Sequence, residues 1–235
     1  MPLAAPEIAR NVQLMHERIA RAAERSGRSI SDVTLVAVSK TFSADAIRSA
    51  HAAGLRHFGE NRVQERETKS AAVAELGATW HFIGHLQSNK VRRAVDLFDR
   101  IDSIDSAALA RKIDEATGAQ KKTLGVLVEV HMGEASKSGV APADLPALAE
   151  ATISLPHLNL LGLLAVPPYA DDPEFARPYF QTLRKLRDQT AAATGLPLPV
   201  LSMGMSHDFE IAIEEGATEV RIGTALFGAR ARSMA

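Results

Sequence analysis

Lys40 is the residue whose chemistry most needs an explanation. It directly follows residues 33–39, a continuous run of small and β-branched residues typical of a strand buried on both faces, as in parallel sheets. A lysine is costly to bury, because its charge must be solvated or discharged. At the C-terminal end of a strand, where α/β proteins bind their ligands, a desolvated lysine can condense with an aldehyde as a Schiff base. The alternative is a lysine that extends its ammonium group to solvent.

Two loops near the end of the chain form a second candidate site. Ser206 is predicted to cap the N-terminus of a helix whose first turn holds Asp208, and Gly223-Thr224 is a glycine turn that opens another helix. Free backbone N–H groups and the positive end of a helix can bind a phosphate at such loops. The simpler alternative is that Ser206 only caps its helix and Gly223 only turns the chain.

The elements that position these residues alternate regularly between strand and helix. This alternation predicts right-handed βαβ units in an α/β fold, a closed (β/α)8 TIM barrel with an extra N-terminal helix. An open doubly wound sheet is the alternative, but no G-x-G-x-x-G follows any strand. Without a linker or low-complexity tract, residues 1–235 are predicted to form a single domain. The predicted strands cover residues 33–39, 56–59, 79–84, 100–104, 123–130, 158–166, 199–203 and 218–222.

The composition excludes several classes of protein. The chain has 235 residues, 46% of them hydrophobic, with a formal net charge of −1 and no cysteine. Disulfides and thiolate metal sites are therefore excluded, and nothing in the charge favours a nucleic acid or a membrane as a partner. No apolar run is long enough to span a bilayer, so a cytoplasmic protein is expected. His81 and His85 have helical spacing, but Gly84 lies between them, and no metal site is expected.

Once a barrel closes, Lys40 and the two phosphate loops lie at one rim, because the first strand then neighbours the last. One site would thus bind a molecule with an aldehyde at one end and a phosphate at the other. Pyridoxal 5′-phosphate (PLP) is such a molecule. Arg221, two residues before Gly223, points to the same side of its strand and needs a partner in the barrel. The alternative role for Arg221 is an ion pair with an inward acid such as Glu129.

Six motifs, in order along nearly the whole chain, resemble the pyridoxal-phosphate homeostasis protein family. This family is similar to the barrel half of fold-type III PLP enzymes such as alanine racemase. The motifs are VAVSK ending at Lys40, FGENRVQE at 58–65, WHFIGHLQSNK at 80–90, SKSG at 136–139, LSMGMS at 201–206 and VRIGTALFG at 220–228.

The resemblance implies that Lys40 carries the internal aldimine and that Arg221 meets the pyridine nitrogen. It also implies that Asn61 and His81 line the pocket. Two histidines, His131 and His207, stand where the family commonly has asparagine and aspartate, and His207 places a possible cation near the phosphate. The implied cofactor-binding residues are Lys40, Asn61, Ser206, Arg221, Gly223 and Thr224, of which Ser206, Gly223 and Thr224 would hold the phosphate.

The same residues favour binding over turnover. Arginine cannot act as an acid at ordinary pH, so Arg221 would leave the pyridine nitrogen unprotonated and the ring a poor electron sink. Racemases of this fold add a tyrosine base from a further β domain, whereas this sequence ends at Ala235 and its tyrosines, Tyr169 and Tyr179, follow the sixth strand. The expected function is a monomeric carrier or regulator of the PLP pool, with apo PLP enzymes as recipients.

Two other functions stay open. The first is a PLP-dependent amino-acid racemase whose second base comes from a partner chain. The second is a barrel lyase or aldolase in which Lys40 attacks a sugar-phosphate carbonyl without a cofactor. Lys137, in the SKSG motif, could also receive or release cofactor, although a solvated loop lysine is the simpler interpretation.

Overall fold

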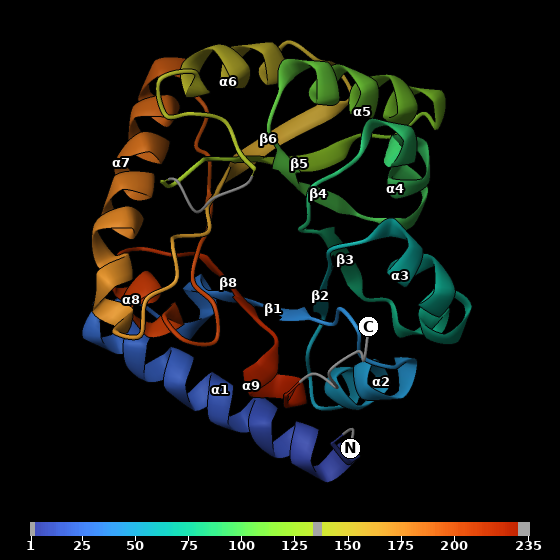
Figure 1. Ribbon diagram of the computed structural model, residues 1–235, viewed down its shortest axis with the longest axis vertical. Helices are drawn as coiled ribbons and strands as arrows, with labels where there is room; N and C mark the ends of the chain where they lie inside the picture. The colour runs from blue at the N-terminus through green and yellow to red at the C-terminus, as the bar shows by residue number, and fades with distance from the viewer. Residues whose placement is uncertain (1–2, 134–137, 230–235) are drawn as a thin grey trace.

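The strands form a closed barrel, as predicted. A computed structural model describes residues 3–133 and 138–229, and in it the strands follow one another around the barrel in chain order, each parallel to its neighbours (Figure 1). The strands are β1 (Thr34–Val38), β2 (His57–Glu60), β3 (Thr79–Phe82), β4 (Arg100–Ile104), β5 (Leu124–Glu129), β6 (Leu158–Leu164), β7 (Val200–Ser202) and β8 (Glu219–Ile222).

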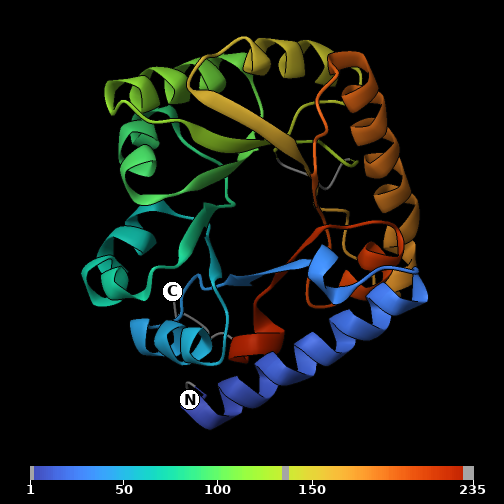
Figure 2. The same ribbon diagram turned by 180° about the vertical axis from the view of Figure 1, so that it is seen from behind.

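Helices surround the barrel, and α1 lies along α2, α8 and α9 (Figures 1 and 2). Helix α9 has only four residues, and α1 lies along the outside of the barrel beside it (Figure 2). The helices are α1 (Ala5–Arg25), α2 (Ala44–Ala52), α3 (Val63–Lys69), α4 (Val91–Leu97), α5 (Ala107–Ala119), α6 (Leu145–Ile153), α7 (Arg177–Thr194), α8 (Phe209–Glu214) and α9 (Thr224–Phe227), with 3-10 helices η1 (Ile30–Asp32), η2 (Ala71–Leu76), η3 (Ser88–Lys90) and η4 (Pro173–Ala176).

The extra N-terminal helix is confirmed, and it supports the last turn of the chain. Its apolar stripe includes Ile8, Val12 and Ile19, which recur at helical spacing and are buried. From the same helix, the Asn11 side-chain amide donates a hydrogen bond to the carbonyl of Leu226 at 2.9 Å. The N-terminal helix therefore fixes α9, which begins directly after the predicted phosphate turn.

Two helix boundaries differ from what the local sequence predicts. The charged residues from about 62 to 75 predict one helix, but α3 ends at Lys69, where Ser70 donates its hydroxyl to the Glu67 carbonyl at 2.7 Å, and the chain continues as η2. The sequence also predicts a helix with Pro142 and Asp144 in its first turn, but α6 begins at Leu145, with Asp144 as its N-cap.

The apolar core lies between the outer face of the barrel and the helices. The inside of the barrel is different from this core, because the register of the strands places charged side chains there as well as apolar ones. Val36 is in register with both His57 and Arg221, and neighbours in register point to the same face. Barrel interiors are usually filled with branched apolar side chains. This one is largely polar, and its polar groups must be paired.

A bulge in β6 adjusts the register between β5 and β6. Val126 pairs with Leu160 and Leu127 pairs with Gly162, so Leu161 has no partner across the ladder. A Cβ on Gly162 would lie 1.8 Å from the carbonyl oxygen of Val200 on β7. Only glycine therefore lets the bulged strand approach β7 closely enough to continue the barrel.

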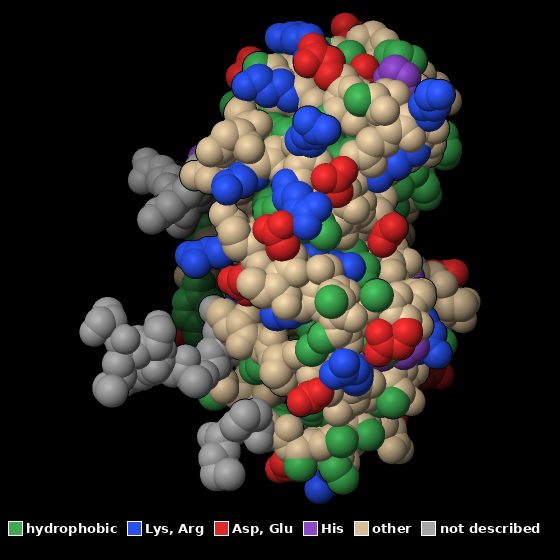
Figure 3. Space-filling view, turned by 90° about the vertical axis from the view of Figure 1, so that its right-hand side faces the viewer, with side chains coloured by type: hydrophobic (Ala, Val, Ile, Leu, Met, Phe, Trp, Pro, Cys, Tyr) green, Lys and Arg blue, Asp and Glu red, His purple; other side chains and the backbone are tan. Residues whose placement is uncertain are grey.

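No helix of the described residues is long and apolar enough to cross a bilayer. On the side of the molecule where α3, α4 and α5 lie, acidic and basic side chains are interspersed (Figure 3). This face offers no patch of one sign of the kind that attracts a nucleic acid.

We expect Gly162→Ala to lower the free energy of unfolding by about 3 kcal/mol, because the added methyl group collides with backbone rather than with a movable side chain. Gly27→Ala is the matched control: its φ is +69° and nothing lies within 4 Å of the new methyl group, so it should cost only about 1 kcal/mol. Urea unfolding of the two variants measures the difference. Equal losses would contradict the role of Gly162.

Candidate cofactor site

Lys40 lies two residues beyond the last residue of β1, partly exposed, in a turn that is tightly held. The next residue, Thr41, has a φ of +68°, a left-handed conformation that costs a residue other than glycine roughly 1–3 kcal/mol. The backbone N–H of Thr41 donates to Oε2 of Glu65 at 2.8 Å. This hydrogen bond from the first turn of α3 helps to stabilise the unfavourable conformation.

The residue before Lys40 is held as well. The Ser39 hydroxyl donates to Oε1 of Glu60 at 2.8 Å, and Lys69 Nζ donates to the same oxygen at 2.8 Å and to the Ser39 carbonyl at 3.0 Å. Burial raises the pKa of Glu60, and the nearby Lys69 ammonium opposes that shift. Glu60 lies in the FGENRVQE motif, but nothing in the local sequence indicates that it and Lys69 support the residue before Lys40.

Ser206 is not the N-cap of a helix, contrary to the prediction. Helix α8 begins at Phe209, with Asp208 as its N-cap, because the Asp208 carboxylate accepts the backbone N–H of Met205 at 2.6 Å and closes a turn ahead of the helix. Burial raises the pKa of Asp208, and the bond from Met205 opposes this. The Ser206 hydroxyl instead accepts the N–H of Ala225 at 3.4 Å, so the two predicted phosphate loops contact each other.

The backbone of these loops leaves donors available. Gly204 has a φ of +92°, and a Cβ there would lie 2.6 Å from the Cβ of Ala212, so glycine lets the loop pack closely against α8. Across residues 3–133 and 138–229, no hydrogen bond uses the N–H of Ser206, Gly223 or Thr224. Three unused N–H groups in two touching loops fit a bound phosphate.

Strand pairing brings Lys40 and the phosphate loops to the same rim. Ala37 of β1 is in register with Ile222 of β8, so Lys40 and Gly223 leave neighbouring strands at the same end of the barrel. Asn61 follows β2, on the other side of β1. Its Oδ1 atom is buried and has no hydrogen-bond partner within the described part of the chain, as expected for a group that faces a ligand or a water molecule.

Arg221 is buried in the barrel below this rim, with 4% of its surface exposed. Nη1 donates to the hydroxyl of Ser202 at 2.7 Å, and Nη2 donates to the carbonyl of Ala165 at 3.0 Å. The alternative ion pair with Glu129 is not among the salt bridges of the described residues, and Glu129 instead accepts the Ser138 hydroxyl at 2.8 Å. Burial lowers the pKa of Arg221, and the surrounding carboxylates, Glu219 first, oppose the shift.

Arg221 is connected to a further ion-pair cluster inside the barrel. Ser202 donates its hydroxyl to Oε1 of Glu219 at 2.7 Å, and the other oxygen of Glu219 accepts from Arg100. The Arg100 guanidinium also makes a bidentate pair with Asp102, at 2.6 and 2.8 Å. Burial disfavours the charged form of Asp102, but Arg100 outweighs it and holds the pKa of this carboxyl well below its usual range.

His81 also belongs to this interior cluster, although it was expected to line the cofactor pocket. Its Nδ1 lies 3.2 Å from Asp102 Oδ2, and its Nε2 lies 3.0 Å from Nδ1 of His57. Burial, together with the neighbouring His81, lowers the pKa of His57 and so disfavours its charged form. The chain of contacts therefore runs from His57 through Asp102 and Arg100 to Arg221.

One set of potential metal ligands occurs in the described residues: side-chain atoms of His81, Asp102 and Glu219 lie within 4.8 Å of one another. The Arg100 guanidinium already bridges the two carboxylates and supplies the positive charge that they require. This cluster is therefore a structural ion-pair network. A signal in the sequence could have revealed it, because Arg100 and Asp102, like Glu219 and Arg221, stand two residues apart and must share one face of a strand.

His207 and Tyr169, two residues named from the sequence, lie side by side. His207 Nε2 lies 3.0 Å from the carbonyl oxygen of Asp171, and the Tyr169 ring lies 5.5 Å from the His207 ring. Tyr169 is 77% exposed. Lys137 lies outside the described residues.

Comparison with known proteins decides the family. The family model described as alanine racemase, N-terminal domain, matches residues 9–231. A protein of Pseudomonas aeruginosa named pyridoxal phosphate homeostasis protein is 50% identical over 95% of this chain and 96% of its own length. The corresponding protein of Aquifex aeolicus is 48% identical over 91% of this chain and 94% of its own. The chain belongs to the pyridoxal phosphate homeostasis protein family. The resemblance inferred from the six motifs is thus confirmed.

A solved structure of the same fold extends the comparison. PipY of Synechococcus elongatus, solved with PLP bound, is 41% identical and superimposes with a TM-score of 0.80 over 91% of this chain and 99% of its own. The barrel of this family member therefore has the same architecture as the one described above.

We expect Asp102→Asn to destabilise the protein by about 3–5 kcal/mol, because it leaves the buried Arg100 guanidinium without its bidentate partner. The matched control is Asp144→Asn, an exposed aspartate whose side chain makes no capping bond, which should change stability by less than about 0.5 kcal/mol.

The pH dependence of this loss follows from the pKa of Asp102, which folding lowers. The stabilisation is present above the unfolded value of about 4 and declines as the pH falls below it. The difference in unfolding free energy between the wild type and Asp102→Asn should therefore shrink in acid, as urea titrations at several pH values can show. A difference independent of pH would contradict the ion pair.

Proposed function

We propose that this protein binds PLP through a Schiff base on Lys40 and takes part in intracellular PLP homeostasis, with little or no catalytic turnover. The observation that carries the proposal is the rim itself. Lys40 closes β1 next to two touching loops whose N–H groups, at Ser206, Gly223 and Thr224, donate no hydrogen bond to any described residue. A lysine for the aldehyde and N–H donors for the phosphate are the two groups that PLP requires.

Arg221 supports binding rather than turnover. Two of its five N–H groups donate hydrogen bonds to Ser202 and Ala165. The others remain available to donate a hydrogen bond to the pyridine nitrogen. A guanidinium keeps its protons even when burial lowers its pKa, so it would donate a hydrogen bond and leave the ring nitrogen unprotonated. PLP bound in this way would be a weak electron sink, and carbanion chemistry would be slow.

The relatives support the same role. The proteins at 48% and 50% identity are named for pyridoxal phosphate homeostasis, and a structure of PipY at 41% identity has PLP bound. We further infer that the protein acts in the cytoplasm as a monomer and passes PLP to apo PLP enzymes. Asn61, with its buried and unpartnered Oδ1, would contact the cofactor from the β2 side.

The Schiff base can be tested by absorption spectroscopy. Purified protein mixed with PLP should show a visible band that borohydride removes, and Lys40→Ala should abolish it. Lys112→Ala, an exposed lysine on α5, should keep the band. If Lys40→Ala retains the band, the assignment to Lys40 is wrong and Lys137 becomes the first candidate. If the wild type has no band, the cofactor proposal itself is wrong.

Turnover can be tested on the PLP-loaded protein. Incubated with L- or D-alanine, it should not interconvert the two at an enzymatic rate. Mixed with an apo PLP enzyme, it should restore that enzyme's activity. The alternative function, favoured by the match to the alanine racemase N-terminal domain, is a PLP-dependent amino-acid racemase. Racemisation at rates typical of enzymes would establish the racemase and refute the carrier.

A further inference from the structure

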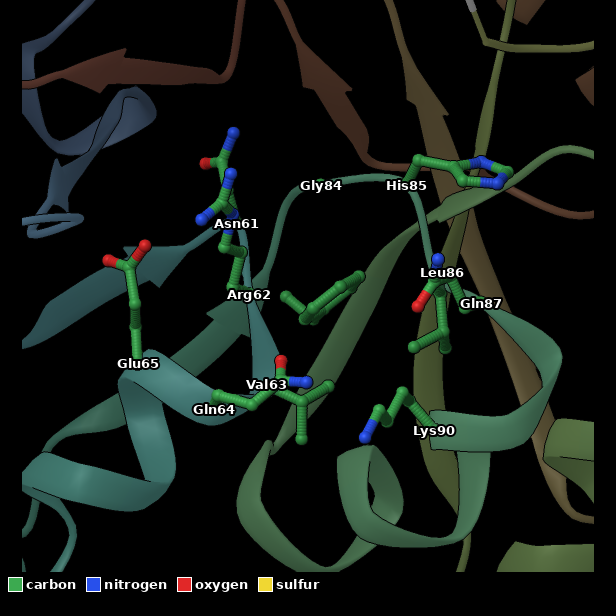
Figure 4. Close-up of a pocket in the computed structure, with 11 residues that line it drawn as sticks. Asn61, Arg62, Val63, Gln64, Glu65, Gly84, His85, Leu86, Gln87 and Lys90 are labelled. Carbon is green, nitrogen blue, oxygen red and sulfur yellow. The ribbon is translucent and has the colours of Figure 1, made fainter. Parts of the chain in front are cut away.

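Two quoted motifs contain residues that the cofactor site does not use. Residues 62–65 are the N-cap and first turn of α3, and residues 85–90 run through the loop after β3 into η3. The structure brings these segments together as the walls of a pocket of about 690 Å³, named here the α3–η3 pocket (Figure 4). This volume lies within the range of small-molecule sites, roughly 300–1,000 Å³.

The floor of the α3–η3 pocket is apolar. Val63, Phe82 and Leu86 line it, and each is almost completely buried. These side chains come from α3, β3 and the loop after β3, so the floor is built by three different elements. An apolar floor beneath polar walls is the usual composition of a site for a small organic ligand.

The walls carry two cations, Arg62 and Lys90, and one carboxylate, that of Glu65, which forms no ion pair with either cation. Arg62 and Gln64 stand on one side of the opening, and Gln87 and Lys90 stand on the other (Figure 4). Within residues 3–133 and 138–229, none of these four side chains has an ion pair or a hydrogen bond. The nearby carboxylate of Glu65 accepts the backbone N–H of Thr41 and so is partly engaged elsewhere.

Backbone contacts hold the walls of the pocket together. A Cβ on Gly84 would lie 2.3 Å from the carbonyl oxygen of Asn61, so the backbones of the two walls are in direct contact. The Ser103 hydroxyl donates to the carbonyl of Gly84 at 2.5 Å and fixes the loop from the β4 side. A preformed site loses little conformational entropy when it binds a ligand.

We propose that the α3–η3 pocket binds a small organic anion with an apolar body, either a carboxylate or a phosphate ester. Arg62 and Lys90 bind the anionic group, because the two cations have no acid of their own. The amides of Gln64 and Gln87 hydrogen-bond to the ligand, and Val63 packs against its apolar part. Asn61 and Glu65 also line the pocket, so it adjoins the cofactor site. The five residues assigned to the anion belong neither to the phosphate loops nor to the Lys40 turn, so the proposal does not depend on PLP binding.

The test is a titration followed by ¹H–¹⁵N NMR, with benzoate as the carboxylate probe and phenyl phosphate as the phosphate probe. Binding in the pocket should shift the side-chain amide signals of Gln64 and Gln87. Binding at the cofactor site would instead shift the backbone signals of Ser206, Gly223 and Thr224, so the two sites are separated in the same spectrum. The tighter of the two probes identifies the class of anion.

A double variant, Arg62→Gln with Lys90→Gln, should weaken the tighter probe by roughly tenfold or more, because the anion loses both charged partners. The matched control, Arg92→Gln with Lys112→Gln, removes the same charge from exposed positions outside the pocket and should leave the affinity unchanged. The dispersion of each spectrum shows that the variant is folded.

Benzamide, which has the ring of benzoate without its charge, should bind far more weakly. Three outcomes would overturn the proposal: no shift of the Gln64 and Gln87 amides with either probe, equal weakening in the two double variants, or benzamide binding as tightly as benzoate. None of these outcomes bears on whether Lys40 binds PLP.

Discussion

The guanidinium of Arg100, held between the carboxylates of Asp102 and Glu219, is the interaction on which the barrel interior depends. Charged groups inside a barrel are costly unless each has a partner. Because Arg100 compensates both acids, Glu219 is free to accept the hydroxyl of Ser202, and Ser202 in turn accepts from Arg221. The group nearest the rim is thus oriented by an ion pair deeper in the barrel.

The rim is held from outside the barrel as well. Glu60 and Glu65 fix the residues on either side of Lys40, while Asn11 of α1 holds α9 behind the phosphate turn. These contacts place the lysine and the two proposed phosphate loops on rigid elements. Sites that bind without large rearrangement need such support, since a misplacement of about 1 Å weakens a directional contact.

The two kinds of charge in the molecule have different consequences. Inside the barrel every cation has an oxygen partner, which makes Arg100 and Arg221 parts of a fixed framework. At the α3–η3 pocket, Arg62 and Lys90 are among the cations of the described residues that have no such partner, so their charge is available to a ligand. The paired charges therefore stabilise the framework below the rim, whereas the unpaired charges of the neighbouring pocket can bind an anion.

Much of the fold could be predicted from local sequence. The apolar run before Lys40 and the alternation of strand and helix predicted the barrel, because burial on both faces and helical periodicity are properties of neighbouring residues. The glycine turn at Gly223 was predicted for the same reason. The N-cap at Ser206 was wrong, because the hydrogen bond of Asp208 to Met205, and not local propensity alone, decided where α8 begins.

What only the tertiary structure decided depends on residues that are distant in sequence. Arg100 and Glu219 are 119 positions apart, and their pairing appears only when β4 and β8 point side chains into one closed barrel. The contact of Asn61 with Gly84, which joins the walls of the α3–η3 pocket, likewise requires β2 and β3 to be neighbours. The sequence by itself determined which elements form and that Lys40 ends a buried strand. Tertiary packing decided which side chains those elements bring together, because ion pairs and cavities depend on distances between elements, and local periodicity carries no information about those distances.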